Sequence, residues 1–268
     1  MSEASEATAG GAGTGAAQQL TDLRDKVAIV TGASSGIGAA IAEALAQQGA
    51  HVALAARRTE QLEALASRLQ QVAPESQTLV VPCDVRVPQD AERLVQSTLD
   101  RWGRLDILIV NAGFGYRAPI VEGDVARWKD LFDTNVYGLL LTLKYGVRPM
   151  LAQRSGHVIV TSSVAARVVT PGGGAYCGSK AAATAIAEAL RMEVARDGVR
   201  VTTIEPGVVI SEFQRVAEYA PGILENMLKG AQPLVPADIA RTVIFALQQP
   251  THVGVHELVI RPAGQTYP

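Results

Sequence analysis

The sequence predicts a single-domain α/β fold in which helices cover both faces of a doubly wound parallel sheet of seven strands. Three observations predict it. Short, continuous apolar runs recur along the chain, as expected for strands that are buried on both faces. Segments with the apolar spacing of helices alternate with these runs. A glycine-rich turn joins the first apolar run to the first helical segment, as in folds that bind nucleotides.

The composition fits one folded domain and excludes several classes of function. Of the 268 residues, 48% are hydrophobic, which is enough for a large core, and we see neither an internal repeat nor a linker. The net charge of −2 leaves no basic surplus for nucleic acid. No apolar run approaches the roughly 20 residues that cross a bilayer, so no membrane is expected as a partner. The two cysteines suggest reduced thiols in a cytoplasmic protein rather than a disulfide framework.

The first 19 residues are predicted to be a disordered tail, because they are mostly Ala, Gly, Ser, Thr and Glu and have little to bury. A regulatory tail is the alternative. The folded domain is expected over residues 20–268. Its strands are predicted at 27–30, 51–56, 78–81, 106–110, 157–160, 199–204 and 256–260, and its helices at 38–48, around Leu62, Leu65 and Leu69, and at 87–102, 125–153, 176–196 and 237–248.

The glycine-rich turn after the first strand indicates nucleotide binding. Gly32 allows a tight turn, Gly36 allows the backbone to approach a pyrophosphate, and Gly38 allows close packing of the helix on the sheet. The first N–H groups of the helix then face the phosphates. A plain glycine turn is the alternative reading. The loop residues predicted to contact the nucleotide are Gly32, Ser34, Ser35, Gly36, Ile37 and Gly38.

The end of the second strand predicts which dinucleotide is bound. An acidic residue there favours NAD, whereas an arginine accommodates the 2′-phosphate of NADP. The chain has Arg57 and Arg58 at this point, and Ser35 could add a hydroxyl donor. We therefore expect NADP(H), preferred over NADH by at least about tenfold, with most of the preference lost in Arg57→Ala. The alternative is that both arginines only solvate a loop.

A tyrosine and a lysine four residues apart indicate acid–base chemistry. Tyr176 and Lys180 fall on one face of an alanine-rich helix, and a nearby ammonium lowers the pKa of a phenol. A phenol tuned in this way can transfer a proton near neutral pH. Most such pairs are merely a solvated helix face. Here, however, a serine pair ends the fifth strand upstream, and Asn135-Val136-Tyr137-Gly138 interrupts a predicted helix with residues that disfavour it.

Taken together, these motifs resemble the short-chain dehydrogenase/reductase family, in its soluble, cytosolic, NADP(H)-preferring branch. The resemblance covers about residues 26–262 and implies a Rossmann-type fold. It is carried by Thr31-Gly32-x-x-x-Gly36-Ile37-Gly38, Asn111-Ala112-Gly113, Asn135, Ser163, Tyr176-x-x-x-Lys180 and Pro206-Gly207. Four residues depart from the common pattern, Val110, Cys177, Gly178 and Ser211, and none of them is a proton-transfer residue.

The resemblance implies a catalytic role for four residues. Tyr176 would exchange a proton with the substrate oxygen, Lys180 would lower the pKa of Tyr176 and bind the nicotinamide ribose, and Ser163 would donate a hydrogen bond to the same oxygen. Asn135 would hold a water that links Lys180 to solvent. The resemblance implies Ser163 rather than Ser162, because the family's serine precedes its tyrosine by 13 residues. Further cofactor contacts are implied for Asp84, Val85, Asn111, Ala112, Gly113, Pro206, Gly207, Val209 and Ser211.

The implied function is an oxidoreductase that interconverts a ketone or aldehyde and an alcohol, working as a homotetramer or homodimer. An NAD(P)-binding regulator without catalysis, or a dehydratase or epimerase, are the alternatives. The substrate is expected to contact Phe114 and Tyr116, which could equally be core residues, and the apolar segment 211–230 is expected to form a lid. No metal site is expected, because His252 and His256 fall in a loop and a strand.

Overall fold

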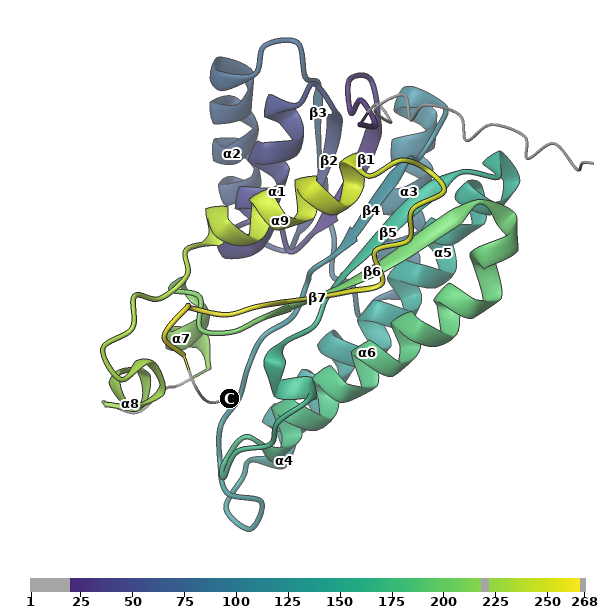
Figure 1. The fold of residues 1–268 in the computed structure, drawn as a ribbon. Coiled ribbons are helices and arrows are strands. Elements are labelled where there is room, and N and C mark those ends of the chain that lie inside the picture. Colours follow the sequence, from purple (N-terminus) through teal and green to yellow (C-terminus); the bar gives the residue numbers. More distant parts are fainter. Residues whose placement is uncertain (1–19, 218–221, 266–268) are drawn as a thin grey trace, which may run out of the picture.

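The computed structural model describes residues 20–217 and 222–265, and it confirms the predicted fold class. One sheet of seven parallel strands has the order β3-β2-β1-β4-β5-β6-β7 (Figure 1). The strands are β1 (Val27–Thr31), β2 (His51–Ala56), β3 (Thr78–Pro82), β4 (Ile107–Val110), β5 (Gly156–Thr161), β6 (Val199–Pro206) and β7 (Glu257–Ile260). The predicted disordered tail, residues 1–19, lies outside the described residues.

The strand sequences follow from their place in the sheet. Every residue of β1 and β4 is buried, because helices cover both faces of these central strands, and this explains their continuous apolar runs. The edge strand β7 instead alternates between exposed and half-buried residues. Because the chain runs outward from β1 in one direction and from β4 in the other, the crevice between their carboxyl ends is the expected binding position.

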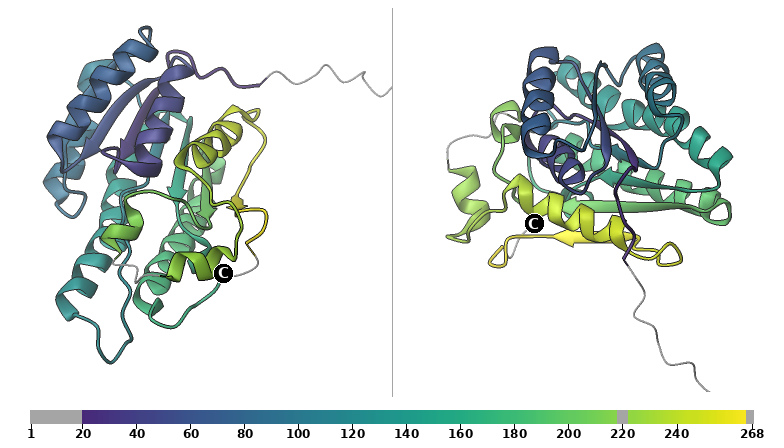
Figure 2. Two further views of the ribbon diagram at one scale, coloured as in Figure 1. Left: turned by 90° about the vertical axis from the view of Figure 1, so that its left-hand side faces the viewer. Right: turned by 90° about the horizontal axis from the view of Figure 1, so that it is seen from above.

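Two layers of helices enclose the sheet, as the two turned views show (Figure 2). One face carries α1 (Gly36–Gln47), α2 (Thr59–Val72) and α9 (Pro236–Gln248), whose buried side chains form one core with the strands. The other face carries α3 (Pro88–Trp102), α5 (Gly138–Gln153) and α6 (Gly174–Val194), which form a second core. The sheet therefore separates two apolar cores, and the loops at its carboxyl edge stay open for a site.

The helical region predicted over 125–153 has these bounds in the structure and is divided at the Asn-Val-Tyr-Gly segment. It consists of α4 (Val125–Phe132), a π-helical turn (Asp133–Tyr137) and α5. Asn135 is buried within the turn and makes tertiary hydrogen bonds. Gly138 follows, where an added Cβ would lie 2.7 Å from Cγ2 of Val85. The residues that disfavour a helix thus mark a π-turn, which is a frequent feature of functional sites.

Two short helices lie in the segment 211–230, which is expected to form a lid. They are α7 (Phe213–Val216) and α8 (Ile223–Leu228), and both lie beyond the carboxyl ends of the strands (Figure 1). Helix α6 begins two residues before Tyr176, and β6 continues two residues past Ile204 to Pro206. Among the helices of residues 20–217 and 222–265, none is long and apolar enough to cross a membrane.

Candidate active site

A cavity of about 830 Å³ runs along the carboxyl edge of the sheet, where the sequence placed its candidate residues. The predicted residues that line it are Gly32, Ser34, Ser35, Gly36, Ile37, Arg57, Arg58, Asp84, Val85, Asn111, Ala112, Gly113, Phe114, Ser163, Tyr176, Lys180, Pro206, Gly207, Val209 and Ser211. Gly38, Tyr116 and Asn135 lie behind this lining. The cavity therefore joins the glycine loop to the tyrosine–lysine pair.

The glycines of the loop are required by close contacts. A Cβ added to Gly32 would lie 2.9 Å from Cα of Ala112. A Cβ added to Gly38 would lie 2.3 Å from the carbonyl oxygen of Gly32. Gly32 also has a positive φ of 68°, which favours glycine. Gly38 thus permits the close packing of α1 on the sheet, while Gly36 and Ile37 bring the start of α1 to the cavity wall.

Thr31 and Asn111 fasten the ends of β1 and β4 to each other. The Thr31 hydroxyl donates to the carbonyl oxygen of Ile109 (3.1 Å) and accepts from the backbone N–H groups of Asn111 (3.0 Å) and Ala112 (3.2 Å). The Asn111 side chain donates back to the carbonyl oxygen of Thr31 (3.1 Å). These bonds fix the crevice between the two strands, and Asn111 acts from its wall.

Arg58, rather than Arg57, binds the hydroxyl groups of the glycine loop. Its Nη2 donates to Oγ of Ser35 (2.6 Å) and to Oγ of Ser34 (3.0 Å). Its Nη1 donates to Glu212, which precedes α7 (3.0 Å). Arg57 lines the same cavity and is exposed, so both arginines face the space beyond β2.

Asp84 forms the opposite wall with a partner that the sequence did not indicate. Arg86 donates to the Asp84 carboxylate from Nε (3.0 Å) and Nη2 (2.7 Å), and these hydrogen bonds hold the pKa of Asp84 below its usual value. Arg86 also pairs with Asp130 of α4 (3.2 Å) and lines the cavity. The Asp84 carboxylate is thus neutralised locally, and the adjacent Val85 supplies an apolar surface.

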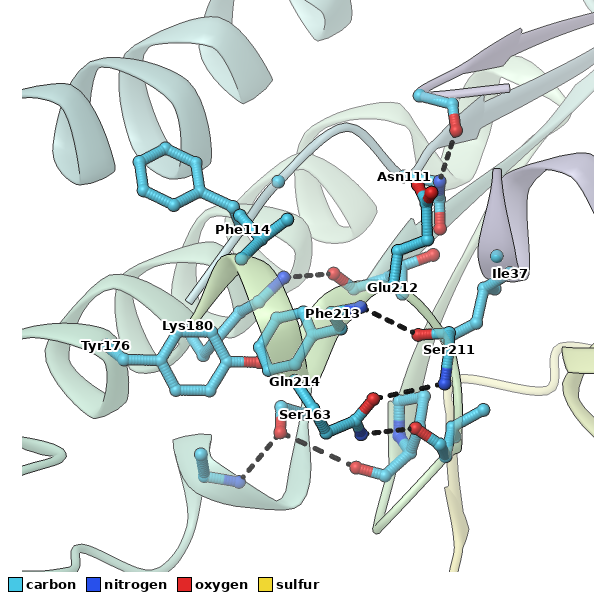
Figure 3. A pocket seen from close by; sticks show the side chains of 18 of the residues that line it. Ile37, Asn111, Phe114, Ser163, Tyr176, Lys180, Ser211, Glu212, Phe213 and Gln214 are labelled. Atoms are coloured by element: carbon cyan, nitrogen blue, oxygen red, sulfur yellow. Dashed lines mark hydrogen bonds between the residues drawn. The ribbon is translucent and has the colours of Figure 1, made fainter. Parts of the chain in front are cut away.

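Lys180 is a buried cation beneath the catalytic tyrosine candidate. Its Nζ donates to the carbonyl oxygen of Thr161 at the end of β5 (2.8 Å), and burial lowers the pKa of Lys180 to about 8. Lys180 is therefore mainly protonated at neutral pH. Tyr176 lies one turn earlier on α6, and its ring packs against Phe213 with 5.6 Å between centroids (Figure 3).

Ser163 stands at the start of a 3-10 turn (Val164–Ala166) that follows β5. Its Oγ accepts from the backbone N–H of Ala165 (3.1 Å) and lies 3.5 Å from the carbonyl oxygen of Pro206. Gln265 stabilises the loop after β6, because its Oε1 accepts a hydrogen bond from the backbone N–H of Val208 (3.1 Å). Ser162 also belongs to the cavity lining, but it is buried and its Oγ bonds to Thr184 (2.8 Å).

Asn135 acts from behind the cavity wall. Its Oδ1 accepts from the backbone N–H of Phe114 (3.0 Å), and its Nδ2 donates to the carbonyl oxygen of Phe114 (2.9 Å) and to Oγ of Ser179 (3.0 Å). An added Cβ at Gly113 would lie 2.9 Å from Oδ1 of Asn135 and 3.6 Å from Nζ of Lys180. The π-turn thus joins the loop after β4 to α6 at the level of Lys180.

The two aromatic residues expected to contact substrate are separated by the structure. Phe114 lines the cavity, whereas Tyr116 is buried behind it. The Tyr116 hydroxyl accepts from the backbone N–H of Asp124 (3.1 Å), and its ring lies under Arg127, 5.2 Å from centroid to Cζ. The structure therefore places Phe114, and not Tyr116, in the cavity lining.

Several lining residues were not assigned to the site individually from the sequence. Phe213, Val216, Ile223 and Met227 come from the 211–230 segment, whose apolar composition was the only signal for them. Arg127 of α4 lines the cavity beside Phe114, 5.9 Å from its ring centroid. The side of the cavity next to Tyr176 is therefore mainly apolar, with a cation near Phe114.

Comparison with known proteins identifies the family. Residues 26–220 match the family model described as short chain dehydrogenase, and the chain belongs to this family. It is 40% identical to an uncharacterised oxidoreductase of Staphylococcus saprophyticus, over 91% of this chain and 100% of that protein. It is 42% identical to a glycine betaine reductase of Emericella nidulans, again over 91% of this chain but over 19% of that longer protein.

Solved structures agree with this assignment. An alcohol dehydrogenase of the archaeon Thermococcus sibiricus, in complex with 5-hydroxy-NADP, superposes with a TM-score of 0.81 at 33% identity, covering 91% of this chain and 99% of that one. A serine dehydrogenase in complex with NADP⁺ superposes with a TM-score of 0.82 at 31% identity, covering 90% and 96%. The protein is therefore an oxidoreductase with the short-chain dehydrogenase fold.

Proposed function

We propose that this protein is an NADP(H)-dependent oxidoreductase that interconverts a ketone or aldehyde and an alcohol, with Tyr176 as general acid and base. One observation carries the proposal. A single cavity is lined at one end by the glycine loop with Arg57 and Arg58, and at the other by Ser163, Tyr176 and Lys180.

The residues at the glycine loop fit a dinucleotide. Cβ atoms would clash at Gly32 and Gly38, so only glycines leave the backbone in this close arrangement beside the cavity. Asn111, Ala112 and Gly113 form the crevice wall, and Asp84 and Val85 are suited to the adenine. Arg57 and Arg58 stand where a 2′-phosphate would lie, with the Ser34 and Ser35 hydroxyls beside them. The other end of the proposed cofactor site is lined by the residues that follow β6, namely Pro206, Gly207, Val209 and Ser211.

The cofactor, when bound, supplies or accepts the hydride. Tyr176 then donates a proton to the substrate oxygen during reduction and takes it back during oxidation. The Ser163 hydroxyl donates a hydrogen bond to the same oxygen, where negative charge develops. Phe213 packs against the Tyr176 ring at the cavity wall.

Lys180 and Asn135 support the proton transfer. The Lys180 ammonium is held by the carbonyl oxygen of Thr161, and its positive charge favours the phenolate form of Tyr176. Asn135 binds both the loop at Phe114 and Ser179 of α6, and it thereby fixes the distance between the cofactor wall and Lys180. Its proposed place in a water-linked proton path rests on the family resemblance.

The choice of NADP(H) draws support from two solved neighbours that hold NADP or a derivative of it. Another neighbour, a 7α-hydroxysteroid dehydrogenase that is 25% identical, was crystallised with NADH. The fold therefore accommodates both cofactors, and the argument for NADP(H) rests on Arg57 and Arg58 with no acidic residue at Ala56.

The substrate is proposed to be a small molecule with an apolar body. Phe114, Val164, Val168, Phe213 and Met227 line the cavity beyond Tyr176. The segment 211–230, of which the structure describes 211–217 and 222–230, supplies part of this lining and is proposed as a substrate lid.

We further propose a cytoplasmic homodimer or homotetramer. Three large apolar side chains, Phe132, Tyr137 and Leu140, are exposed near the junction of α4 and α5, and such a patch favours self-association. Both cysteines are free and buried, as expected in a reducing compartment. Light scattering after size exclusion tests the assembly, and a mass of one chain at all concentrations would contradict it.

An activity screen tests the proposed function. NADPH and NADH are each supplied with aliphatic, aryl and steroid ketones, and the loss of absorbance by the reduced cofactor is followed. We expect turnover with NADPH and at least one carbonyl compound, and the reverse reaction with NADP⁺ and the matching alcohol. If both cofactors bind but no carbonyl or alcohol is turned over, the protein is a regulator or catalyses another reaction on this fold.

A further inference from the structure

A carboxylate lies over the glycine loop at the open end of the cavity. Glu212 belongs to the segment between β6 and α7, and its Oε2 accepts from Nη1 of Arg58 (3.0 Å). The Ser35 hydroxyl is a second hydrogen-bond partner of this carboxylate. The same Arg58 binds Ser34 and Ser35 through Nη2 and Nε. Glu212 is thus hydrogen-bonded to Arg58 and Ser35, the groups at this end of the cavity that can bind an anion.

These groups are the ones that a phosphate would use. A guanidinium fork and a serine hydroxyl beside a helix N-terminus form a strong anion site, and a carboxylate and a phosphate compete for the same donors. Arg86 neutralises Asp84, the other acidic residue of this wall. Asp130 also lines the cavity and is paired with Arg86. Glu212 is therefore the carboxylate that faces Arg58.

We propose that Glu212 is an internal anion that occupies Arg58 and Ser35 and is displaced when a cofactor with a 2′-phosphate binds, so that it weakens binding of NADP(H) and sets the degree of cofactor preference. This inference rests on the proposed function, because it assumes that the cavity binds a dinucleotide. It concerns a residue outside the glycine loop and the second strand, to which dinucleotide choice is ordinarily attributed.

The contact is suited to displacement. The side chains of Arg58 and Glu212 are 42% and 44% exposed, and ion pairs of this kind contribute little to stability. The hydrogen bonds from Arg58 and Ser35 nevertheless keep the pKa of Glu212 below its usual value, so the carboxylate is ionised at neutral pH. A phosphate dianion in the same place would have to compete with Glu212 for the donors of Arg58 and Ser35. It would also be repelled by the negative charge of Glu212.

Equilibrium binding measures the effect without turnover. Isothermal titration calorimetry gives dissociation constants of NADP⁺, NAD⁺ and 2′,5′-ADP for the unmodified protein, for Glu212→Gln and for Glu225→Gln. Glu225 is an exposed acid of α8 and serves as the matched control for a change of net charge. Gln keeps the shape of the side chain, and thermal melts of each variant verify that it is folded.

We expect Glu212→Gln to bind NADP⁺ and 2′,5′-ADP at least about threefold more tightly, with a smaller change for NAD⁺. Glu225→Gln should change none of the three constants by as much. Unchanged or weaker NADP⁺ binding by Glu212→Gln would overturn the inference, since Glu212 would then hold Arg58 in place rather than compete for it. If the unmodified protein binds neither dinucleotide, the proposed function fails and the inference fails with it.

Discussion

At the scale of single residues, the site combines a buried cation with a tyrosine on one face of α6. Lys180 is buried, and burial lowers its pKa from 10.5 to about 8. Burial of a charged group opposes folding, and the ammonium has one hydrogen bond to the carbonyl oxygen of Thr161 among the described contacts. The buried ammonium therefore has a cost in stability, as expected of a residue that is proposed to serve catalysis.

Lys180→Met should consequently stabilise the protein while abolishing turnover. Below pH 8 the lysine is protonated in the folded and the unfolded chain, so the full penalty applies at pH 7. Each pKa unit corresponds to about 1.4 kcal/mol, which gives an increase of about 1–3 kcal/mol in the free energy of unfolding after the lost hydrogen bond is allowed for. Urea denaturation at pH 7 measures it. A less stable variant would show that the ammonium contributes more to folding than its burial costs.

Cofactor choice is a second property of single residues. The sequence assigned it mainly to Arg57, whereas the structure directs Arg58 to the loop hydroxyls. Arg57→Ala and Arg58→Ala should each lower kcat/KM for NADPH by at least about tenfold and leave NADH nearly unchanged, because each removes a charged donor to the 2′-phosphate. Arg68→Ala, which removes an ion pair with Glu43 on the outer surface, is the control. Equal use of NADPH and NADH by the unmodified enzyme would refute this reading.

At the scale of elements, the sequence predicted which strands and helices exist and in what order better than it predicted the local geometry of turns and loops. The apolar runs predicted all seven strands, and they are most continuous in the central strands β1 and β4, which are buried on both faces, whereas the edge strand β7 is partly exposed. The π-turn around Asn135 was not predicted, because its stabilising partners, Phe114 and Ser179, are distant in sequence. The pairing of Glu212 with Arg58 and the packing of Phe213 on Tyr176 depend in the same way on where the 211–230 segment folds back.

For the candidate site residues too, the sequence predicted the positions at strand ends and not the directions of side chains in the loops. Residues fixed by strand ends, such as Asn111 and Ser163, were placed at the cavity from sequence alone. Phe114 and Tyr116 could not be distinguished, because the direction of the loop between them depends on Asp124 and Arg127 of the following segment. The sequence therefore located the chemistry, while side-chain direction in the loops required the tertiary structure.

A buried histidine in β5 gives the sheet a defined response to acid. His157 donates from Nε2 to Thr202 of β6, since the Thr202 hydroxyl itself donates to the carbonyl oxygen of Val255. Burial, with the nearby charge of Arg200, lowers the pKa of His157 from 6.5 to about 3. The folded chain thus binds fewer protons than the unfolded chain between these values, and stability falls as the pH drops below 6.5.

Between pH 7.5 and pH 5.0, the free energy of unfolding of His157→Gln should fall by about 2 kcal/mol less than that of the unmodified protein. The reason is that the histidine of the unfolded chain is almost fully protonated at the lower pH. Gln retains a donor toward Thr202. Chemical denaturation at both pH values measures the difference, and His252→Gln, a change at an exposed histidine, is the control. If the variant and the unmodified protein lose the same stability, His157 is protonated in the folded state.

At the scale of the whole molecule, the two-sided sheet explains why the site lies at one edge. Helices cover both faces, so the carboxyl ends of the strands are where loops can present polar groups to a ligand. The β1–β4 crevice places the glycine loop at one end, and β5 and β6 place Ser163 and the Pro206 turn at the other. The 211–230 segment contributes to the wall at both ends, through Glu212 and Phe213.

The central claim is that this arrangement moves a proton through Tyr176 while the rest of the cavity holds the cofactor. Tyr176→Phe keeps the ring that packs against Phe213 and removes only the hydroxyl. Turnover at saturating NADPH should fall by at least about 100-fold, as expected for loss of a general acid, while calorimetry shows an unchanged dissociation constant for NADP⁺. Tyr145→Phe, a change on α5 outside the cavity lining, should leave both values as they are. Turnover of Tyr176→Phe equal to that of the unmodified enzyme would contradict the account.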